Sequence, residues 1–77
     1  MSKLPVIKAA KLEKILLYLG FVFQRQKGSH VFYRHPDGRY TTIPHHPGKY
    51  LPRELIRTIL KQVNLSIAEF LDLLNKV

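Results

Sequence analysis

The residues of this sequence that are best suited to chemistry are its histidines, which are His30, His35, His45 and His46. An imidazole has an unperturbed pKa of about 6.5, so it can take up or release a proton at neutral pH. The absence of cysteine excludes disulfide scaffolds, cysteine-based zinc sites and thiol nucleophiles. Neither a Gly-x-Ser-x-Gly elbow nor a glycine-rich phosphate loop is present. Proton transfer by a histidine is therefore the chemistry that these residues favour.

His30 differs from the other histidines in its sequence surroundings. It directly follows Gly28-Ser29, and the cations nearby are Arg25, Lys27 and Arg39. Glycine allows close approach of a backbone, and the cations can hold a phosphate against the imidazole. A base at this position can remove the proton of a ribose 2′-hydroxyl, whose oxygen then attacks the adjacent phosphorus without a metal ion. On spacing alone, the alternative interpretation is an ordinary polar residue of a strand.

The adjacent pair His45-His46 raises the question of a metal site. Neighbouring residues of an extended segment point in opposite directions, and no carboxylate cluster completes a ligand set. We therefore expect neither a metal nor a small-molecule cofactor.

The chain is strongly basic. Its 77 residues include 13 Lys and Arg against 5 Asp and Glu, which gives a formal net charge of +8. This surplus favours a polyanionic partner, such as nucleic acid, an acidic protein or anionic lipid. Between residues 24 and 49 the cations are interleaved with the aromatic residues Phe32, Tyr33 and Tyr40. Aromatic rings in such a region can stack on bases, although some of them must fill the core.

The N-terminal half of the chain predicts a helix followed by three strands. Apolar residues recur at helical spacing within residues 6–19, and we expect this helix to begin after Pro5 and to end at Gly20. Two turns, Lys27-Gly28-Ser29 and Pro36-Asp37-Gly38, separate the three predicted strands. In the first strand Phe21, Phe23 and Arg25 are expected to share one side. In the second strand, 30–34, we expect His30, Phe32 and Arg34 on one face and Val31 and Tyr33 on the other. The third strand is predicted at 39–43.

The C-terminal half predicts a loop and two helices. Residues 44–52 contain three prolines and form the loop, and a helix follows at about 53–63 with Asn64 as a left-handed cap. Ser66 and Glu69 make a capping box that opens a last helix at about 66–76, whose inward residues are predicted to be Ile67, Phe70, Leu71 and Leu74. The predicted class is α+β in a single domain with a core at about 5–64, with helices on one face of a three-stranded antiparallel sheet. The opposite face is left open, and function is expected there.

A set of motifs in order along the chain, from about Pro5 to Ser66, resembles the HicA toxin family of the HicA–HicB toxin–antitoxin systems. The matching residues are Gly20-Phe21, Arg25-Gln26-Lys27-Gly28-Ser29-His30, Tyr33, Pro36-Asp37-Gly38-Arg39, Thr42-Ile43-Pro44, His46, Gly48-Lys49 and Leu51. The resemblance implies a double-stranded-RNA-binding-like fold, α-β-β-β-α. It also implies a metal-independent ribonuclease that acts on mRNA and a HicB antitoxin that covers the active site.

The family's catalytic histidine lies in its Gly-Ser-His motif, so the resemblance assigns that role to His30. His46, Gly48 and Lys49 match a second stretch of the family. Two departures concern the second helix, where Arg53-Glu54-Leu55-Ile56-Arg57 replaces a common Gly-Thr-Leu-Arg stretch and Asn64 replaces a frequent glycine.

The leading hypothesis is thus an endoribonuclease with His30 as general base. Its expected RNA contacts are Arg25, Lys27, Gly28, Ser29, Arg39, His46 and Lys49. The proton donor to the leaving oxygen is left open between His46, Tyr33 and water. A non-catalytic RNA-binding module and a domain for an acidic protein partner are the alternatives. A membrane-surface role is disfavoured because the first helix needs its apolar stripe for the core. No apolar run is long enough to span a membrane, and the start of the chain lacks a signal pattern, so we expect a cytoplasmic protein.

Overall fold

The computed structural model describes residues 4–77. Its elements in chain order are α1 (Ala9–Tyr18), β1 (Val22–Lys27), β2 (His30–Arg34), β3 (Tyr40–Pro44), α2 (Arg53–Gln62) and α3 (Ile67–Leu74). The strands form one antiparallel sheet in the order β1-β2-β3. This order confirms the predicted α+β class and is consistent with the double-stranded-RNA-binding-like fold.

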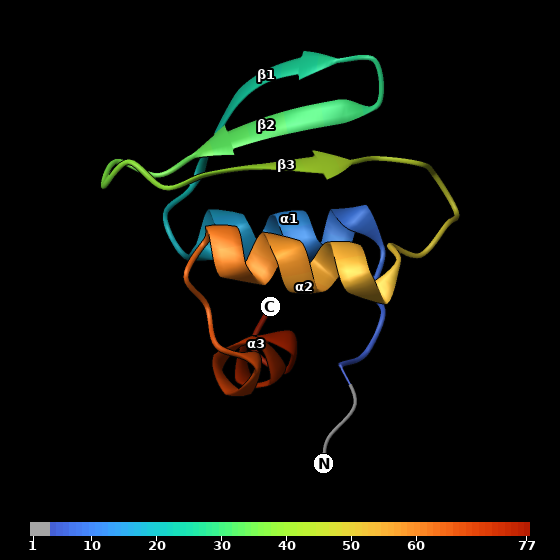
Figure 1. Ribbon diagram of the computed structural model, residues 1–77, viewed down its shortest axis with the longest axis vertical. Helices are drawn as coiled ribbons and strands as arrows, with labels where there is room; N and C mark the ends of the chain where they lie inside the picture. Colours follow the sequence, from blue (N-terminus) through green and yellow to red (C-terminus); the bar gives the residue numbers. More distant parts are fainter. Residues whose placement is uncertain (1–3) are drawn as a thin grey trace.

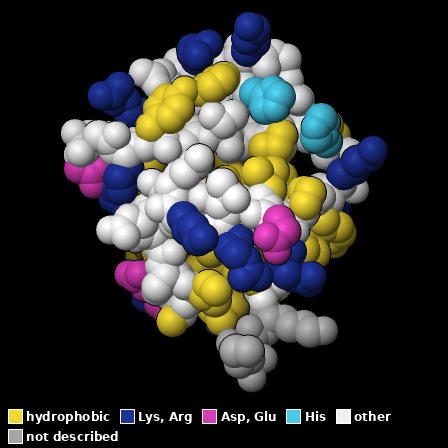
Figure 2. Space-filling model, viewed as in Figure 1, with side chains coloured by type: hydrophobic (Ala, Val, Ile, Leu, Met, Phe, Trp, Pro, Cys, Tyr) yellow, Lys and Arg dark blue, Asp and Glu magenta, His cyan; other side chains and the backbone are white. Residues whose placement is uncertain are grey.

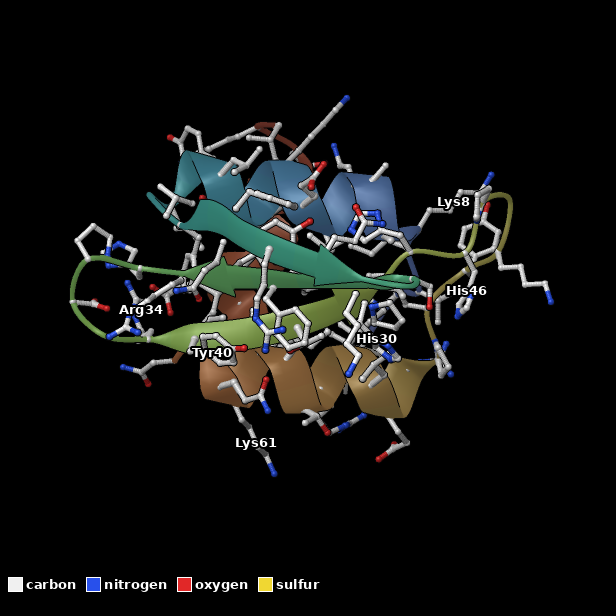
Figure 3. The ribbon with its side chains drawn as sticks, turned by 90° about the horizontal axis from the view of Figure 1, so that it is seen from above. Lys8, His30, Arg34, Tyr40, His46 and Lys61 are labelled. Carbon is white, nitrogen blue, oxygen red and sulfur yellow. The ribbon has the colours of Figure 1, made fainter. Side chains whose placement is uncertain are left out.

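The described elements are stacked in three layers (Figure 1). Helices α1 and α2 lie side by side against one face of the sheet, and α3 lies on the side of these helices that is remote from the sheet. Buried side chains from every layer form a single core, among them Leu12, Tyr33, Ile43, Ile56 and Phe70. No described helix covers the other face of the sheet (Figure 3), so this face is free to meet a ligand.

Alternation along β2 and β3 separates the two faces of the sheet. Val31, Tyr33, Thr41 and Ile43 are buried against the helices, while His30 is exposed on the other side. The predicted division of 30–34 into two faces is therefore confirmed. It follows from the two-residue period of a strand, which places apolar residues toward the helices at every second position.

The first strand is present, but the prediction that Phe21, Phe23 and Arg25 share one side of it was wrong. Phe21 is buried but precedes β1, and the pairing with β2 shifts register between Phe23 and Arg25. Phe23 pairs with Tyr33, which faces the helices, whereas Arg25 pairs with Phe32, which lies on the other face. A bulge of this kind adds one residue to one strand and turns the following side chains to the opposite face.

Helix α1 begins three residues later than a start immediately after Pro5 would place it. The amide of Leu51 donates to the carbonyl of Ile7 (2.8 Å), and Lys8 forms an isolated antiparallel bridge with Tyr50. This pairing holds the chain extended before Ala9. At the other end Gly20 has φ +100°, and its amide donates to the carbonyl of Leu17, which confirms the predicted glycine cap.

The C-terminal caps are also confirmed. Asn64 has φ 55° and occupies the left-handed position after α2. The Ser66 side chain accepts from the amide of Glu69 and the Glu69 carboxylate accepts from the amide of Ser66, which is the predicted capping box. The predicted inward set needs one correction, because Ile67 is exposed and Leu73 is buried. The helix phase places Leu73 beside Phe70, toward the core.

Candidate active site

A two-residue turn fixes the position of His30. Gly28 and Ser29 join β1 to β2, and Lys27 pairs with His30 across the turn. Gly28 has φ +59° while Ser29 is not among the positive-φ residues, which is the pattern of a type II′ hairpin. An added Cβ at Gly28 would meet no atom within 4 Å, so the backbone conformation alone requires glycine there. The turn places the Lys27 and His30 side chains on the same face of the sheet.

That open face presents cations and aromatic rings beside the imidazole. By register and alternation it contains Arg25 and Lys27 of β1, His30, Phe32 and Arg34 of β2, and Tyr40, Thr42 and Pro44 of β3. The guanidinium of Arg25 lies 4.2 Å from the centroid of the Phe32 ring, a cation–π contact. The ring of Tyr40 lies 6.0 Å from that of Phe32. No acidic residue belongs to this set, so the face favours a polyanion.

The structure separates the histidines into two kinds. The Nε2–H of His35 donates to the carbonyl of Leu19 (3.0 Å), and its Nδ1 accepts from the amide of Asp37 (3.1 Å). His45 bonds the hydroxyl of Tyr33. Within residues 4–77 the side chains of His30 and His46 have no hydrogen-bond partner, and both are exposed. These two rings lie toward the same end of the sheet (Figure 3) and are the imidazoles available for chemistry.

A network of hydrogen bonds centred on the buried Tyr33 holds the loop that carries His46. The Tyr33 hydroxyl donates to the Glu13 carboxylate of α1, so its 2.9 Å contact with His45 requires Nε2 of that ring to carry the hydrogen. Burial, and then the bond to Glu13, raises the pKa of Tyr33 far above its usual value. The amide of His45 also donates to the carbonyl of Ser29 (2.7 Å). The loop is therefore fixed to both α1 and the Gly28-Ser29 turn.

The sequence did not point to Glu13 or to the bond between His45 and Tyr33, because these contacts join segments far apart in the chain. The only available signal was that Glu13 is the single acid of its helix. Tyr33, one of the candidate proton donors, is fully buried on the helix side with its hydroxyl bonded. It does not share a face with His30, which leaves His46 and water as donors.

Arg39 lies apart from the other expected RNA contacts. It precedes β3, at the β2–β3 turn, and its guanidinium donates to the carboxylate of Asp37 (2.8 Å) and to the carbonyl of Val63. Its centre lies 5.1 Å from the Phe21 ring. The amide of Arg39, and after it the guanidinium, lowers the pKa of Asp37 below its usual value. The structure thus shows Arg39 joining the turn to the end of α2.

The remaining expected contacts lie at or near the His30 end of the sheet. Lys27, Gly28 and Ser29 are adjacent to His30 through the turn, and Arg25 lies farther along β1. Lys49 is exposed in the loop after β3, where its amide donates to the carbonyl of His46 (3.1 Å). Figure 2 shows histidine side chains near Lys and Arg side chains at the sheet end of the molecule.

A groove of about 360 Å³ runs between β3 and α2 and connects with this site. Its lining from the sheet includes His30, Tyr40, Thr42 and Pro44, and its lining from α2 includes Leu55, Thr58, Ile59 and Gln62. No group of three or more His, Cys, Asp or Glu side chains among residues 4–77 is arranged to hold a metal ion. In the same part of the chain, no helix has the length and apolar character needed to cross a membrane.

Fold and site together define a small, basic α+β protein whose sheet has one open face carrying an unpartnered imidazole among cations. A family model described as the HicA toxin of bacterial toxin–antitoxin systems matches residues 9–65. The chain therefore belongs to the HicA toxin family. Membership identifies it as a toxin of a toxin–antitoxin system, with an antitoxin as partner, in a family that generally cleaves RNA. No curated protein sequence matches the chain.

Proposed function

We propose that this toxin is a metal-independent endoribonuclease that cleaves mRNA, with His30 as the general base. The observation that carries the proposal is the exposed, unpartnered imidazole of His30 on the open face, directly opposite Lys27. Residues directly opposite in an antiparallel pair have Cβ atoms about 4.5–5.5 Å apart. One phosphate can therefore contact the Lys27 ammonium while its ribose meets the His30 ring.

The proposed reaction is an intramolecular transesterification of the RNA phosphodiester. His30 takes the proton of the 2′-hydroxyl, the 2′-oxygen bonds the adjacent phosphorus, and the bond from phosphorus to the 5′-oxygen breaks. The leaving 5′-oxygen takes a proton from His46 or from water, so the products end in a 2′,3′-cyclic phosphate and a 5′-hydroxyl. Lys27 and Arg25 stabilise the charge on the phosphoryl oxygens. Gly28, Ser29 and Lys49 are proposed RNA contacts at the same end, and Arg39 is a proposed contact farther away.

The first test is cleavage of single-stranded RNA by the chain and by His30→Ala, purified in parallel. Removal of a general base lowers the rate by about 10²- to 10⁴-fold. Because His30 is exposed and unpartnered, the variant should fold normally and keep its affinity for an uncleavable 2′-O-methyl RNA. Equal cleavage by both proteins would reject His30 as the base. Binding without cleavage by the unaltered chain would favour the alternative, a non-catalytic RNA-binding module.

The products and the metal requirement supply a second test. Fragments should accept a 5′-phosphate from a kinase without prior dephosphorylation, and a 2′-deoxyribose at the cut nucleotide should prevent cleavage there. Activity should survive excess chelator. Loss of activity with chelator, restored by a divalent ion, would refute the proposed mechanism.

We also propose that the antitoxin is HicB-like and covers the open face. The net charge of +8 and the absence of acidic side chains on that face support an acidic partner segment. The antitoxin should therefore compete with 2′-O-methyl RNA for the toxin. Formation of a ternary complex with undiminished RNA affinity would contradict this placement.

A further inference from the structure

One row of side chains on the open face lies outside the core and includes two aromatic rings to which the proposed reaction gives no role. Arg25, Phe32 and Tyr40 come one from each strand. Arg25 pairs directly with Phe32, and Tyr40, which pairs with Arg34, is the diagonal neighbour of Phe32 on β3. The Arg25 guanidinium lies 4.2 Å from the Phe32 centroid, and the Tyr40 ring lies 6.0 Å from the same ring at an interplanar angle of 36°. Tyr40 is 41% exposed, because it lies on the face of the sheet opposite to the core. Aromatic rings grouped on an uncovered face indicate a binding site.

The groove between β3 and α2 joins this row to the candidate active site. His30 and Tyr40 both line it, toward opposite ends of β3. Its volume of about 360 Å³ lies within the size range of small-ligand pockets, roughly 300–1,000 Å³. Thr42 supplies a hydroxyl and Leu55 and Ile59 supply apolar surface. A flat aromatic ligand with polar edges, such as a nucleobase, fits this lining.

The spacing along β2 relates the row to the phosphate position. His30 and Phe32 are two residues apart on the same face, which is about 6.6–6.8 Å along a strand. This distance is close to one nucleotide step of an extended single strand. A base on the row therefore belongs to a nucleotide next to the phosphate at His30.

We propose that Arg25, Phe32 and Tyr40 form a nucleobase-stacking subsite, so that the substrate class is single-stranded RNA with unstacked bases. This inference rests on the proposed function for its connection to cleavage. Bases in a duplex are stacked and paired and cannot lie on such a row, whereas the bases of loops and single strands can. The proposed preference of this protein for single-stranded RNA therefore differs from the recognition of duplex shape that is typical of double-stranded-RNA-binding domains.

The test is a comparison of two uncleavable ligands. One is a 2′-O-methyl oligoadenylate of about eight nucleotides, and the other has the same length with abasic positions. Tyr40→Ala should weaken binding of the oligoadenylate by roughly 5- to 150-fold, the range expected for loss of one stacked base. The abasic ligand should bind both proteins equally. Because stacking neutralises no phosphate, the dependence of affinity on salt should be unchanged.

Two further variants serve as controls. Tyr18→Ala removes a tyrosine that is 60% exposed on α1 and is not part of the open face of the sheet, and it should leave both affinities unchanged. Tyr40→Phe keeps the ring and should bind oligoadenylate like the unaltered chain. Melting temperatures of all variants distinguish loss of stacking from loss of folding.

Several results would overturn the subsite. They are an equal loss for the abasic ligand, no loss for either ligand, tighter binding of a duplex than of the single strand, or no binding by the unaltered chain. Cleavage of unmodified RNA is scored separately. Base-dependent binding without cleavage would reject the proposed chemistry and support the subsite. His30-dependent cleavage with base-independent binding would support the chemistry and reject the subsite.

Discussion

Replacing Lys27 by glutamine tests whether the cation opposite His30 contacts a phosphate. Lys27 pairs with His30 across the two-residue turn, and both side chains lie on the open face. Lys27→Gln removes one positive charge while keeping a side chain of similar length. Since Lys27 is exposed, we expect no change in folding and a loss confined to RNA binding.

The expected loss of RNA affinity in Lys27→Gln follows from counterion release. On a single strand each neutralised phosphate contributes about 0.7 to the slope of log affinity against log salt. Relative to about 1 M salt, one such contact is worth about 4-fold in affinity at about 0.15 M and about 8-fold at about 0.05 M. The variant should therefore lose about 4-fold in affinity near 0.15 M salt, with a slope that is smaller by about 0.7.

The assay is a titration of 2′-O-methyl oligoadenylate at several salt concentrations. Lys61→Gln is the matched control, because Lys61 is exposed and extends from α2 away from the sheet (Figure 3). Its slope should equal that of the unaltered chain. An unchanged slope for Lys27→Gln, or equal losses for the two variants, would refute the phosphate contact opposite His30.

Three further predictions concern stability, each measured by urea unfolding. Tyr33→Phe should lower the free energy of unfolding by about 1–3 kcal/mol, because it leaves a carboxylate and an imidazole without their shared partner; an unchanged midpoint would contradict the network. Gly20→Ala should cost about 1–2 kcal/mol or more, since Gly20 has φ +100° and a Cβ would lie 3.1 Å from Nε2 of His35; a neutral effect would contradict the strain. Glu69→Gln should destabilise the protein at neutral pH and have a smaller effect in acid. The backbone bond from Ser66 lowers the pKa of Glu69, so its contribution is present above the usual carboxyl pKa of about 4.3 and is lost as pH falls through the lowered value; an effect independent of pH would contradict it.

Local sequence signals predicted most of the fold. The turn at Lys27-Gly28-Ser29, the Gly20 and Asn64 caps and the Ser66–Glu69 capping box each depend on residues within a few positions of one another. The two faces of β2 follow from strict alternation. Such features are determined by backbone conformation and short-range hydrogen bonds, which the order of residue types reveals.

The errors arose where distant segments pair. The start of α1 is set by the bridge between Lys8 and Tyr50, which no local pattern predicts. The bulge in β1 reverses the side on which Arg25 lies, because the register is chosen with β2. The network from Glu13 to His45 likewise joins a helix to a loop through Tyr33. A spacing rule within one segment cannot contain these contacts.

The alternation of side chains along β2 separates the residues that stabilise the fold from those that are proposed to act on RNA. Val31 and Tyr33 face the helices, and His30 and Phe32 face solvent. Substitutions on the open face should therefore change RNA binding or cleavage while leaving the core packed, and substitutions on the inner face should first lower stability. The hydroxyl of Tyr33 connects the inner face with the candidate active site, because its bond to His45 holds the loop that carries His46. Loss of that hydroxyl should thus affect both stability and the action on RNA, whereas His46→Ala should weaken RNA binding or cleavage and leave stability unchanged.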